Sequence, residues 1–320
     1  MDAEDAKQTL VRLHERLSRE VAGTVADELV RLGPEALKLL LSFPEPLVLA
    51  ASRHWIVAIA LRMKREEAIP ILLEGLSHPD WRIFQVARDT YAKMGTDGRD
   101  ALVENLKSCD VVGGRKQTLY CLHRLADPFG PLAIGDRTLI APIAEAAASD
   151  ASEEVRAMAV EVLSRSEAHD AEDTIAGALE DASESVRLEA AKAAGRLGLK
   201  KAVGALVEML DHTQAEVRAD VIYSLDRIGE VKSASAVRGR LDDEDWYVRW
   251  AAAKALENLW EPENVAALKR AAEDKNPVVA VAAVETLARK APKEAGDTLA
   301  KAAKSSNESI RTTARHYAGG

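Results

Sequence analysis

A period of 31 residues runs through almost all of this 320-residue chain. Counted from Arg187, the steps define reference positions at 22, 53, 84, 115, 156, 187, 218, 249, 280 and 311, with one break in register. In the last six units, Val or Ile precedes the reference position, and Ala or Val follows it three residues later. A single unit of this length cannot bury its apolar face alone, so the pattern is typical of stacked repeats.

Each unit has room for two short helices. In the stretch 182–198, Val186, Ala190, Ala194 and Leu197 follow helical spacing, and Gly198 stands where a helix commonly ends. An apolar first helix precedes it, as in 201–210, and a polar turn separates the two. No segment alternates with period two over the length of a strand. The sequence therefore predicts an all-α protein, an α-solenoid of about ten helical hairpins stacked into a right-handed superhelix.

The register breaks once, between Arg115 and Arg156, where ten extra residues are inserted. The segment 127–138 holds two prolines and two glycines, which exclude a continuous helix. We therefore expect four repeats in 1–126, the first a cap, an inserted loop at 127–138, and six repeats in 139–320, the last a cap. Together they would form one continuous solenoid. The loop is either a spacer that changes the superhelix angle or a binding loop.

An aspartate in the turn and a Val-Arg pair at the start of the second helix recur together. They occur as Asp150 with Val155-Arg156, Asp181 with Val186-Arg187, and Asp243 with Val248-Arg249. This unit resembles the HEAT repeat, in particular the short HEAT-like repeats of the phycobilisome-lyase group. The resemblance implies a ladder of Asp–Arg pairs between neighbouring repeats, interrupted at Phe84 and Ala280. The unit is shorter than common HEAT repeats, which run to about 40 residues or more.

Charge and cysteine content narrow the possible partners. The formal net charge is −9, and an acidic chain lacks the basic face that general nucleic-acid binding requires. Cys109 and Cys121 have no further Cys or His at ligand spacing, so we expect no metal site and no cofactor. The acidic start does not resemble a signal peptide, and no apolar run is long enough to span a membrane. We expect a cytoplasmic monomer.

The second helices of HEAT-like solenoids line the concave wall, so their side chains opposite the apolar stripe are candidate binding residues. These positions lie 1, 5 and 8 residues after the reference position. The candidate binding residues are His54, Lys116, Tyr120, His123, Lys192, Tyr223, Trp250 and Lys254. Exposed aromatic side chains commonly dominate protein interfaces. The rings of Tyr120, Tyr223 and Trp250 could instead pack against their neighbours. Trp81 and Trp246 are expected to pack across the turn between helices.

Three functions are compatible with these observations. The first is a non-enzymatic scaffold that binds a protein partner along the concave face. The second, implied only by the resemblance, is a bilin or tetrapyrrole lyase-like protein that handles a chromophore. The third is a HEAT-like DNA-repair glycosylase, which the acidic charge disfavours because such an enzyme needs a basic face. No nucleophile–base pair, phosphate loop or paired carboxylates can be recognised, so no catalytic residue is predicted.

Overall fold

The computed structural model describes residues 34–42, 56–57, 60–94, 96–126 and 135–318. Within these ranges every regular element is an α-helix or a 3-10 helix, and none is a strand. The predicted all-α class is confirmed. His54 and most of the inserted segment 127–138 lie outside the described residues.

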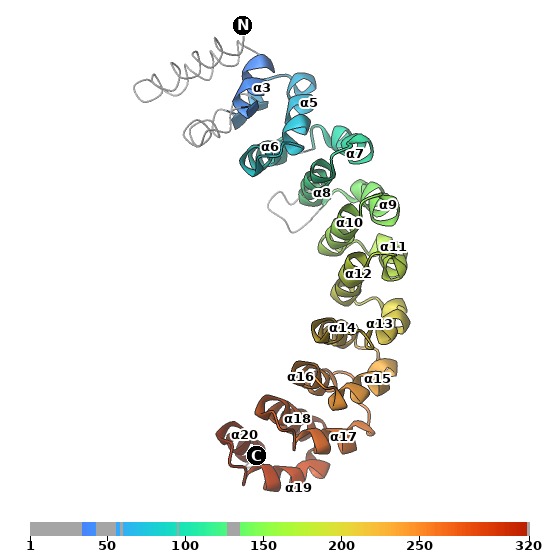
Figure 1. Ribbon diagram of the computed structural model, residues 1–320, viewed down its shortest axis with the longest axis vertical. Coiled ribbons are helices and arrows are strands. Elements are labelled where there is room, and N and C mark those ends of the chain that lie inside the picture. Colours follow the sequence, from blue (N-terminus) through green and yellow to red (C-terminus); the bar gives the residue numbers. More distant parts are fainter. Residues whose placement is uncertain (1–33, 43–55, 58–59, 95, 127–134, 319–320) are drawn as a thin grey trace, which may run out of the picture. The chain divides into compact units, whose positions relative to one another are not determined.

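The chain divides into two compact units, residues 1–171 and residues 172–320. The described helices of unit 1 are α3 (Pro34–Ser42), α5 (Arg65–Leu76), α6 (Trp81–Lys93), α7 (Arg99–Ser108), α8 (Val112–Ala126), η1 (Arg137–Leu139), α9 (Ile140–Ser149), α10 (Glu153–Arg165) and η2 (His169–Ala171) (Figure 1). The predicted division at the insert and the continuity of the solenoid stay predictions.

Unit 2 has shorter first helices, most of which begin or end in a 3-10 turn. Its helices are α11 (Glu172–Gly177), η3 (Ala178–Glu180), α12 (Glu184–Leu197), η4 (Lys200–Ala202), α13 (Val203–Met209), α14 (Ala215–Ile228), η5 (Val231–Ser233), α15 (Ala234–Gly239), η6 (Arg240–Asp242), α16 (Trp246–Ala255), α17 (Asn264–Ala271), α18 (Pro277–Lys290), α19 (Pro292–Ala302) and α20 (Glu308–Ala318).

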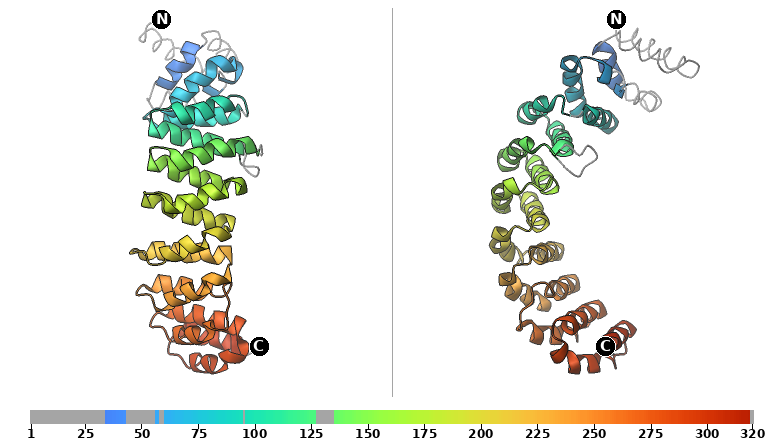
Figure 2. Two further views of the ribbon diagram at one scale, coloured as in Figure 1. Left: turned by 90° about the vertical axis from the view of Figure 1, so that its right-hand side faces the viewer. Right: turned by 180° about the vertical axis from the view of Figure 1, so that it is seen from behind.

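Each unit consists of two layers of helices. In unit 2 the second helices α12, α14, α16, α18 and α20 pack side by side in chain order, and the first helices form the other layer (Figure 2). In unit 1 the second helices α6, α8 and α10 pack in the same way. The outer surface of this row is called the second-helix face below. The predicted α-solenoid is confirmed, while the hand of its superhelix stays a prediction.

Small residues allow the second helices to approach closely. Val186, Ala190 and Ala194 of α12 are fully buried, as the helical spacing predicts. A Cβ atom at Gly195 would lie only 2.7 Å from the Cα atom of Ser224 in α14. Glycine is therefore required at this crossing, because any larger residue would push the two helices apart.

Buried Asp–Arg pairs connect neighbouring repeats. The guanidinium of Arg249 donates from Nε and Nη2 to the Asp274 carboxylate at 2.6 and 3.0 Å, and from Nη1 to the Asp243 carbonyl at 2.8 Å. The same Asp274 carboxylate accepts the N–H of Asn276 at 2.7 Å, which closes the turn. The pairs Arg218–Asp243 and Arg115–Asp150 repeat this bidentate arrangement. The ladder implied by the resemblance is therefore present within each unit.

Histidine takes the place of the turn aspartate twice. The Nδ1 atom of His78 accepts the N–H of Asp80 at 3.0 Å, and Nδ1 of His212 accepts the N–H of Gln214 at 3.1 Å. The imidazole thus closes the turn as a carboxylate would, but it offers no anion to an arginine. The interruption beside Phe84 agrees with the prediction, whereas the one at His212 was not foreseen.

Removal of one ladder arginine is expected to destabilise the chain strongly. Arg249 is 6% exposed, and Arg249→Ala would leave the Asp274 carboxylate without its cation. We expect the free energy of unfolding in urea to fall by about 3 kcal/mol, as for other broken buried pairs. Arg270→Ala is the control, because its 3.4 Å pair with Asp242 is exposed and should contribute less than about 1 kcal/mol. Equal effects of the two substitutions would contradict the assigned role of the ladder.

The buried Asp–Arg pairs also predict that the stability of the fold decreases at low pH. Burial raises the pKa of Asp274, but the hydrogen bonds from Arg249 and from the Asn276 N–H outweigh burial and lower it below the usual value. The contribution of this carboxylate to stability is therefore complete above the unfolded pKa, near ~4, and is lost as the pH falls through the lower folded pKa. In the Asp274→Asn variant, the melting temperature should fall less steeply below about pH 4 than in the wild type. The control Asp211→Asn changes an exposed carboxylate and should leave this pH dependence unchanged.

Candidate functional site

Four aromatic side chains gather on the second-helix face of unit 2. Tyr247 and Trp250 of α16 stack with ring centroids 5.4 Å apart and planes inclined by 22°. Tyr223 of α14 meets Trp250 edge-on with ring centroids 6.3 Å apart, and its ring is tilted by 55° against that of Tyr247 at 6.4 Å. Trp246 contacts Tyr247 edge-on at 5.8 Å. We call these four residues the aromatic cluster.

Helix geometry brings these rings together. Tyr247 and Trp250 are three residues apart in α16, so they lie on the same side of that helix. Helix α14 packs beside α16, which places Tyr223 against both rings. The hydroxyl groups of Tyr223 and Tyr247 are 3.3 Å apart and share a hydrogen bond.

The aromatic cluster remains accessible to solvent. Trp246 is 43% exposed and Tyr247 is 37% exposed, while Tyr223 and Trp250 are half-buried. The sequence left open whether these rings form an exposed binding surface or pack against their neighbours. In the structure the rings of the aromatic cluster pack on one another and still present an apolar surface. Such a surface is the usual form of a protein-binding site.

The expectation that Trp81 and Trp246 pack across the turn is wrong. Trp81 is 62% exposed, and the ring contact of Trp246 is made with Tyr247 of its own helix. Both tryptophans lie four residues before a position that faces away from the apolar stripe. Each tryptophan thus lies one helical turn before an outward position, so each lies on the outward side of its own helix.

Carboxylates adjoin the aromatic cluster in the sequence of α14 and α16. Asp245 caps α16 by accepting the N–H of Tyr247 at 2.7 Å, and Glu216 and Glu244 are exposed. Burial raises the pKa of Tyr223, and the hydrogen bond with Tyr247 and the charges of Asp220 and Asp226 raise it further.

Two predicted lysines flank the aromatic cluster, each in an ion pair between neighbouring second helices. Lys192 of α12 lies 3.4 Å from Asp220 of α14, and Lys254 of α16 lies 3.4 Å from Glu285 of α18. The structure thus brings together four of the predicted residues, Lys192, Tyr223, Trp250 and Lys254, on contiguous helices of unit 2.

Three of the predicted residues, Lys116, Tyr120 and His123, lie on α8 of unit 1 and already have partners within the chain. Lys116 pairs with Glu154 at 2.7 Å, and Nδ1 of His123 lies 3.0 Å from the Ser166 hydroxyl. The guanidinium of Arg88 covers the Tyr120 ring at 4.4 Å. These residues form a second group, separate from the aromatic cluster, and their ring and charges are largely satisfied.

Sequence reasoning missed Tyr247 as a site residue and assigned Trp246 to packing. The available signal was the run Asp245-Trp-Tyr-Val-Arg-Trp250, in which Tyr247 precedes Trp250 by three residues. A position three residues before an outward position shares its side of the helix. Including that offset would have selected Tyr247.

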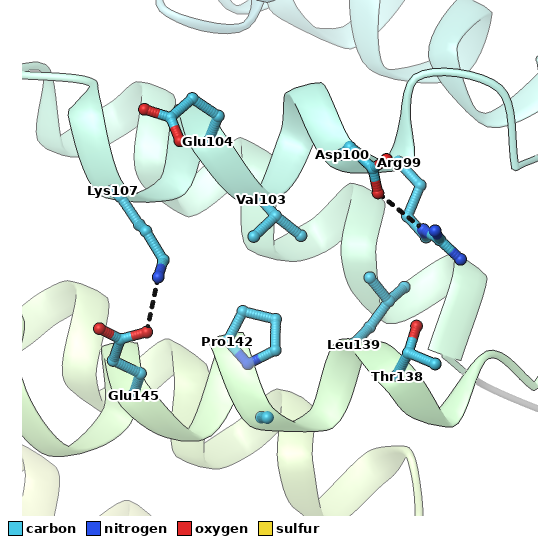
Figure 3. Close-up of a pocket in the computed structure, with 10 residues that line it drawn as sticks. Arg99, Asp100, Val103, Glu104, Lys107, Thr138, Leu139, Pro142 and Glu145 are labelled. Atoms are coloured by element: carbon cyan, nitrogen blue, oxygen red, sulfur yellow. Dashed lines mark hydrogen bonds and ion pairs between the residues drawn. The ribbon is translucent and has the colours of Figure 1, made fainter.

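The first-helix layer carries a different kind of feature, a shallow groove between α7 and α9 of about 540 Å³. Val103, Leu139 and Pro142 face its interior, and the Lys107–Glu145 ion pair crosses it at 2.9 Å (Figure 3). No group of three His, Cys, Asp or Glu that could hold a metal ion occurs in the described part of the chain. The same residues include no helix long and apolar enough to cross a membrane.

Comparison with known protein families agrees with the stacked helical hairpins of the structure. A family model of HEAT repeats matches residues 140–226 and 205–279. A search of curated proteins finds no match to this sequence.

Three of the solved structures that are similar to this chain illustrate the range. A chain from the complex of CpcE and CpcF of phycocyanin lyase from Nostoc sp. PCC7120 has a TM-score of 0.42 at 20% identity, covering 68% of this chain and 85% of that one. YibA of E. coli has a TM-score of 0.56 at 16% identity, with 83% and 96% covered. A chain from the structure of Kap95p with RanGDP has a TM-score of 0.62 at 13% identity, covering 99% of this chain and half of that one.

The two tryptophans of the aromatic cluster are expected to differ in their effect on stability. Trp250 is half-buried between Tyr223 and Tyr247, so Trp250→Ala should lower the free energy of unfolding by about 2 kcal/mol. The more exposed Trp246→Ala should change it by no more than about 0.5 kcal/mol. Urea unfolding followed by circular dichroism measures both. A loss of about 2 kcal/mol for Trp246→Ala would show that this side chain has a structural role.

Proposed function

The chain is a HEAT-repeat protein, and from that premise we propose that it is a non-enzymatic scaffold. It holds a protein partner against the second-helix face of unit 2, with the contact centred on the aromatic cluster. The observation that carries this proposal is the accessible packing of Trp246, Tyr247 and Trp250 beside Tyr223.

The energetics of interfaces support this role. Tyr and Trp bury a large apolar area and lose little conformational entropy on binding, so a few such residues dominate most interfaces. Contacts with Tyr223 and Tyr247 hold the Trp250 ring in place before a partner arrives. Such preorganisation reduces the entropy lost on association.

The flanking ion pairs suit the rim of this interface. Lys192 and Lys254 keep their charges near the surface through the pairs with Asp220 and Glu285. A polar, solvent-accessible rim around an apolar centre is the common arrangement of transient interfaces. Lys116, Tyr120 and His123 of unit 1, together with His54, would belong to a second and separate contact of the same partner or of another one.

The comparisons give further support, at the level of architecture. The similar Kap95p chain comes from a structure in which it binds RanGDP. A HEAT solenoid is thus a fold on which protein partners are held. Function resides in the site and not in the fold, so the aromatic cluster remains the principal argument.

Loss of the aromatic cluster is expected to abolish partner capture. The immobilised full chain and its Trp246→Ala/Tyr247→Ala variant are compared by quantitative mass spectrometry of proteins retained from the lysate of the source cells. At least one protein should fall about tenfold or more in the variant, as expected for a loss of about 1.4 kcal/mol or more.

Trp81→Ala is the matched control, since it removes an even more exposed indole from unit 1. Circular dichroism and urea unfolding establish that all three proteins are equally folded. Identical retention by the wild type and the double variant would exclude the aromatic cluster as the binding site.

A further inference from the structure

We propose that the partner segment bound by the aromatic cluster presents an arginine, whose guanidinium stacks on the Trp246 and Tyr247 rings and pairs with a neighbouring carboxylate. This inference rests on the proposed function, because it specifies the chemistry of the partner at the same site. Its basis is an arrangement that the chain itself forms twice, and that the cluster leaves incomplete.

The first example is in unit 1. The Arg88 guanidinium lies over the Tyr120 ring, with its Cζ atom 4.4 Å from the ring centroid. Nη2 of Arg88 also lies 3.3 Å from the Asp89 carboxylate. One guanidinium thus satisfies a tyrosine face and an acid at the same time.

The second example is in unit 2, at its last hairpin. Cζ of Arg289 lies 5.9 Å from the centroid of the Tyr317 ring, and its Nε donates to the Tyr317 hydroxyl at 3.0 Å. Nη1 of Arg289 pairs with Glu257 at 3.0 Å. Again a tyrosine, an arginine and a carboxylate form one group, here from α20, α18 and the turn after α16.

The aromatic cluster has the rings and the acids of this arrangement but not the cation. Among the described residues, no arginine or lysine lies over the rings of Tyr223, Trp246, Tyr247 or Trp250. The register explains the difference. Tyr120 and Tyr223 occupy equivalent positions, but the residue that corresponds to Arg88 in the preceding repeat is Ala191, which is buried.

Carboxylates adjoin the aromatic cluster along α14 and α16. Asp245 caps α16 immediately before Trp246, and Glu244, whose side chain is 87% exposed, also lies 3.7 Å from Nη2 of Arg218. Glu216 occupies on α14 the position that Tyr247 occupies on α16, and it is exposed. A positively charged side chain above the rings would be attracted by both the ring faces and these acids.

Arginine fits this site better than the alternatives. Its planar guanidinium stacks on aromatic faces and still donates two parallel hydrogen bonds to a carboxylate, which a lysine ammonium does not do. Single-stranded nucleic acid could also stack on exposed rings, but its phosphates would be repelled by Glu216, Glu244 and Asp245. The surrounding charge therefore favours a basic peptide segment.

The experiment selects random 12-residue peptides, displayed on phage, for binding to the immobilised full chain. Peptides that also bind the Trp246→Ala/Tyr247→Ala variant are removed by counter-selection. Arginine should be enriched in the remaining peptides relative to the starting library. In the leading peptide, replacement of arginine by citrulline should weaken binding about 3- to 30-fold, the range of a cation–π contact. Replacement by lysine should have a smaller effect.

Controls separate this inference from the scaffold proposal. The leading peptide should bind Trp81→Ala as tightly as the wild type, and Glu216→Gln/Glu244→Gln more weakly. Cluster-dependent peptides without arginine, or equal binding of the citrulline peptide, would overturn the inference and leave the scaffold proposal standing. Recovery of no cluster-dependent peptide would also overturn it, while the capture experiment tests the scaffold independently. If a labelled single-stranded oligonucleotide binds the wild type but not the Trp246→Ala/Tyr247→Ala variant, the partner is a nucleic acid and the inference of a basic peptide is wrong.

Discussion

The buried bidentate pair between the reference arginine and the turn aspartate of the next repeat is the contact on which this architecture depends. In the Arg249–Asp274 pair, one guanidinium binds the following turn through its carboxylate and its own turn through a carbonyl. Such a group, nearly removed from water, has few alternative geometries, because an unpaired charge would be expensive to bury. Where this pair is present, it therefore fixes how one hairpin is placed on its neighbour.

Small residues along the second helices complete this constraint. Gly195 meets the backbone of Ser224 at the crossing of α12 and α14, and the alanines of the stripe keep the helices close. With the buried side determined in this way, the outward side of each second helix is free to vary between repeats. In α16 that side carries Trp246, Tyr247 and Trp250, whereas α12 has polar residues such as Lys192 there. A regular scaffold thus presents a local and irregular site.

Much of the fold follows from local rules. Apolar spacing and the closing glycine at Gly198 predict the second helices, and the backbone there is indeed left-handed, with φ of +67°. Less of the site could be foreseen. Tyr223 and Trp250 were among the predicted residues, but Trp246 was assigned to packing and Tyr247 was overlooked. The role of His212 as a substitute for the turn aspartate was also hidden, because only the geometry shows its ring accepting the turn N–H.

The sequence by itself determined the repeat, the pairing of helices and the residues able to form the ladder, because all three depend on spacing within one or two neighbouring repeats. Only the tertiary structure decided which outward side chains meet. Tyr120 is covered by Arg88, while Tyr223 is joined by Tyr247 and Trp250 and by no cation among the described residues. The physical reason is that contacts between helices depend on the distance and rotation set by packing, and periodicity along one helix does not contain that information.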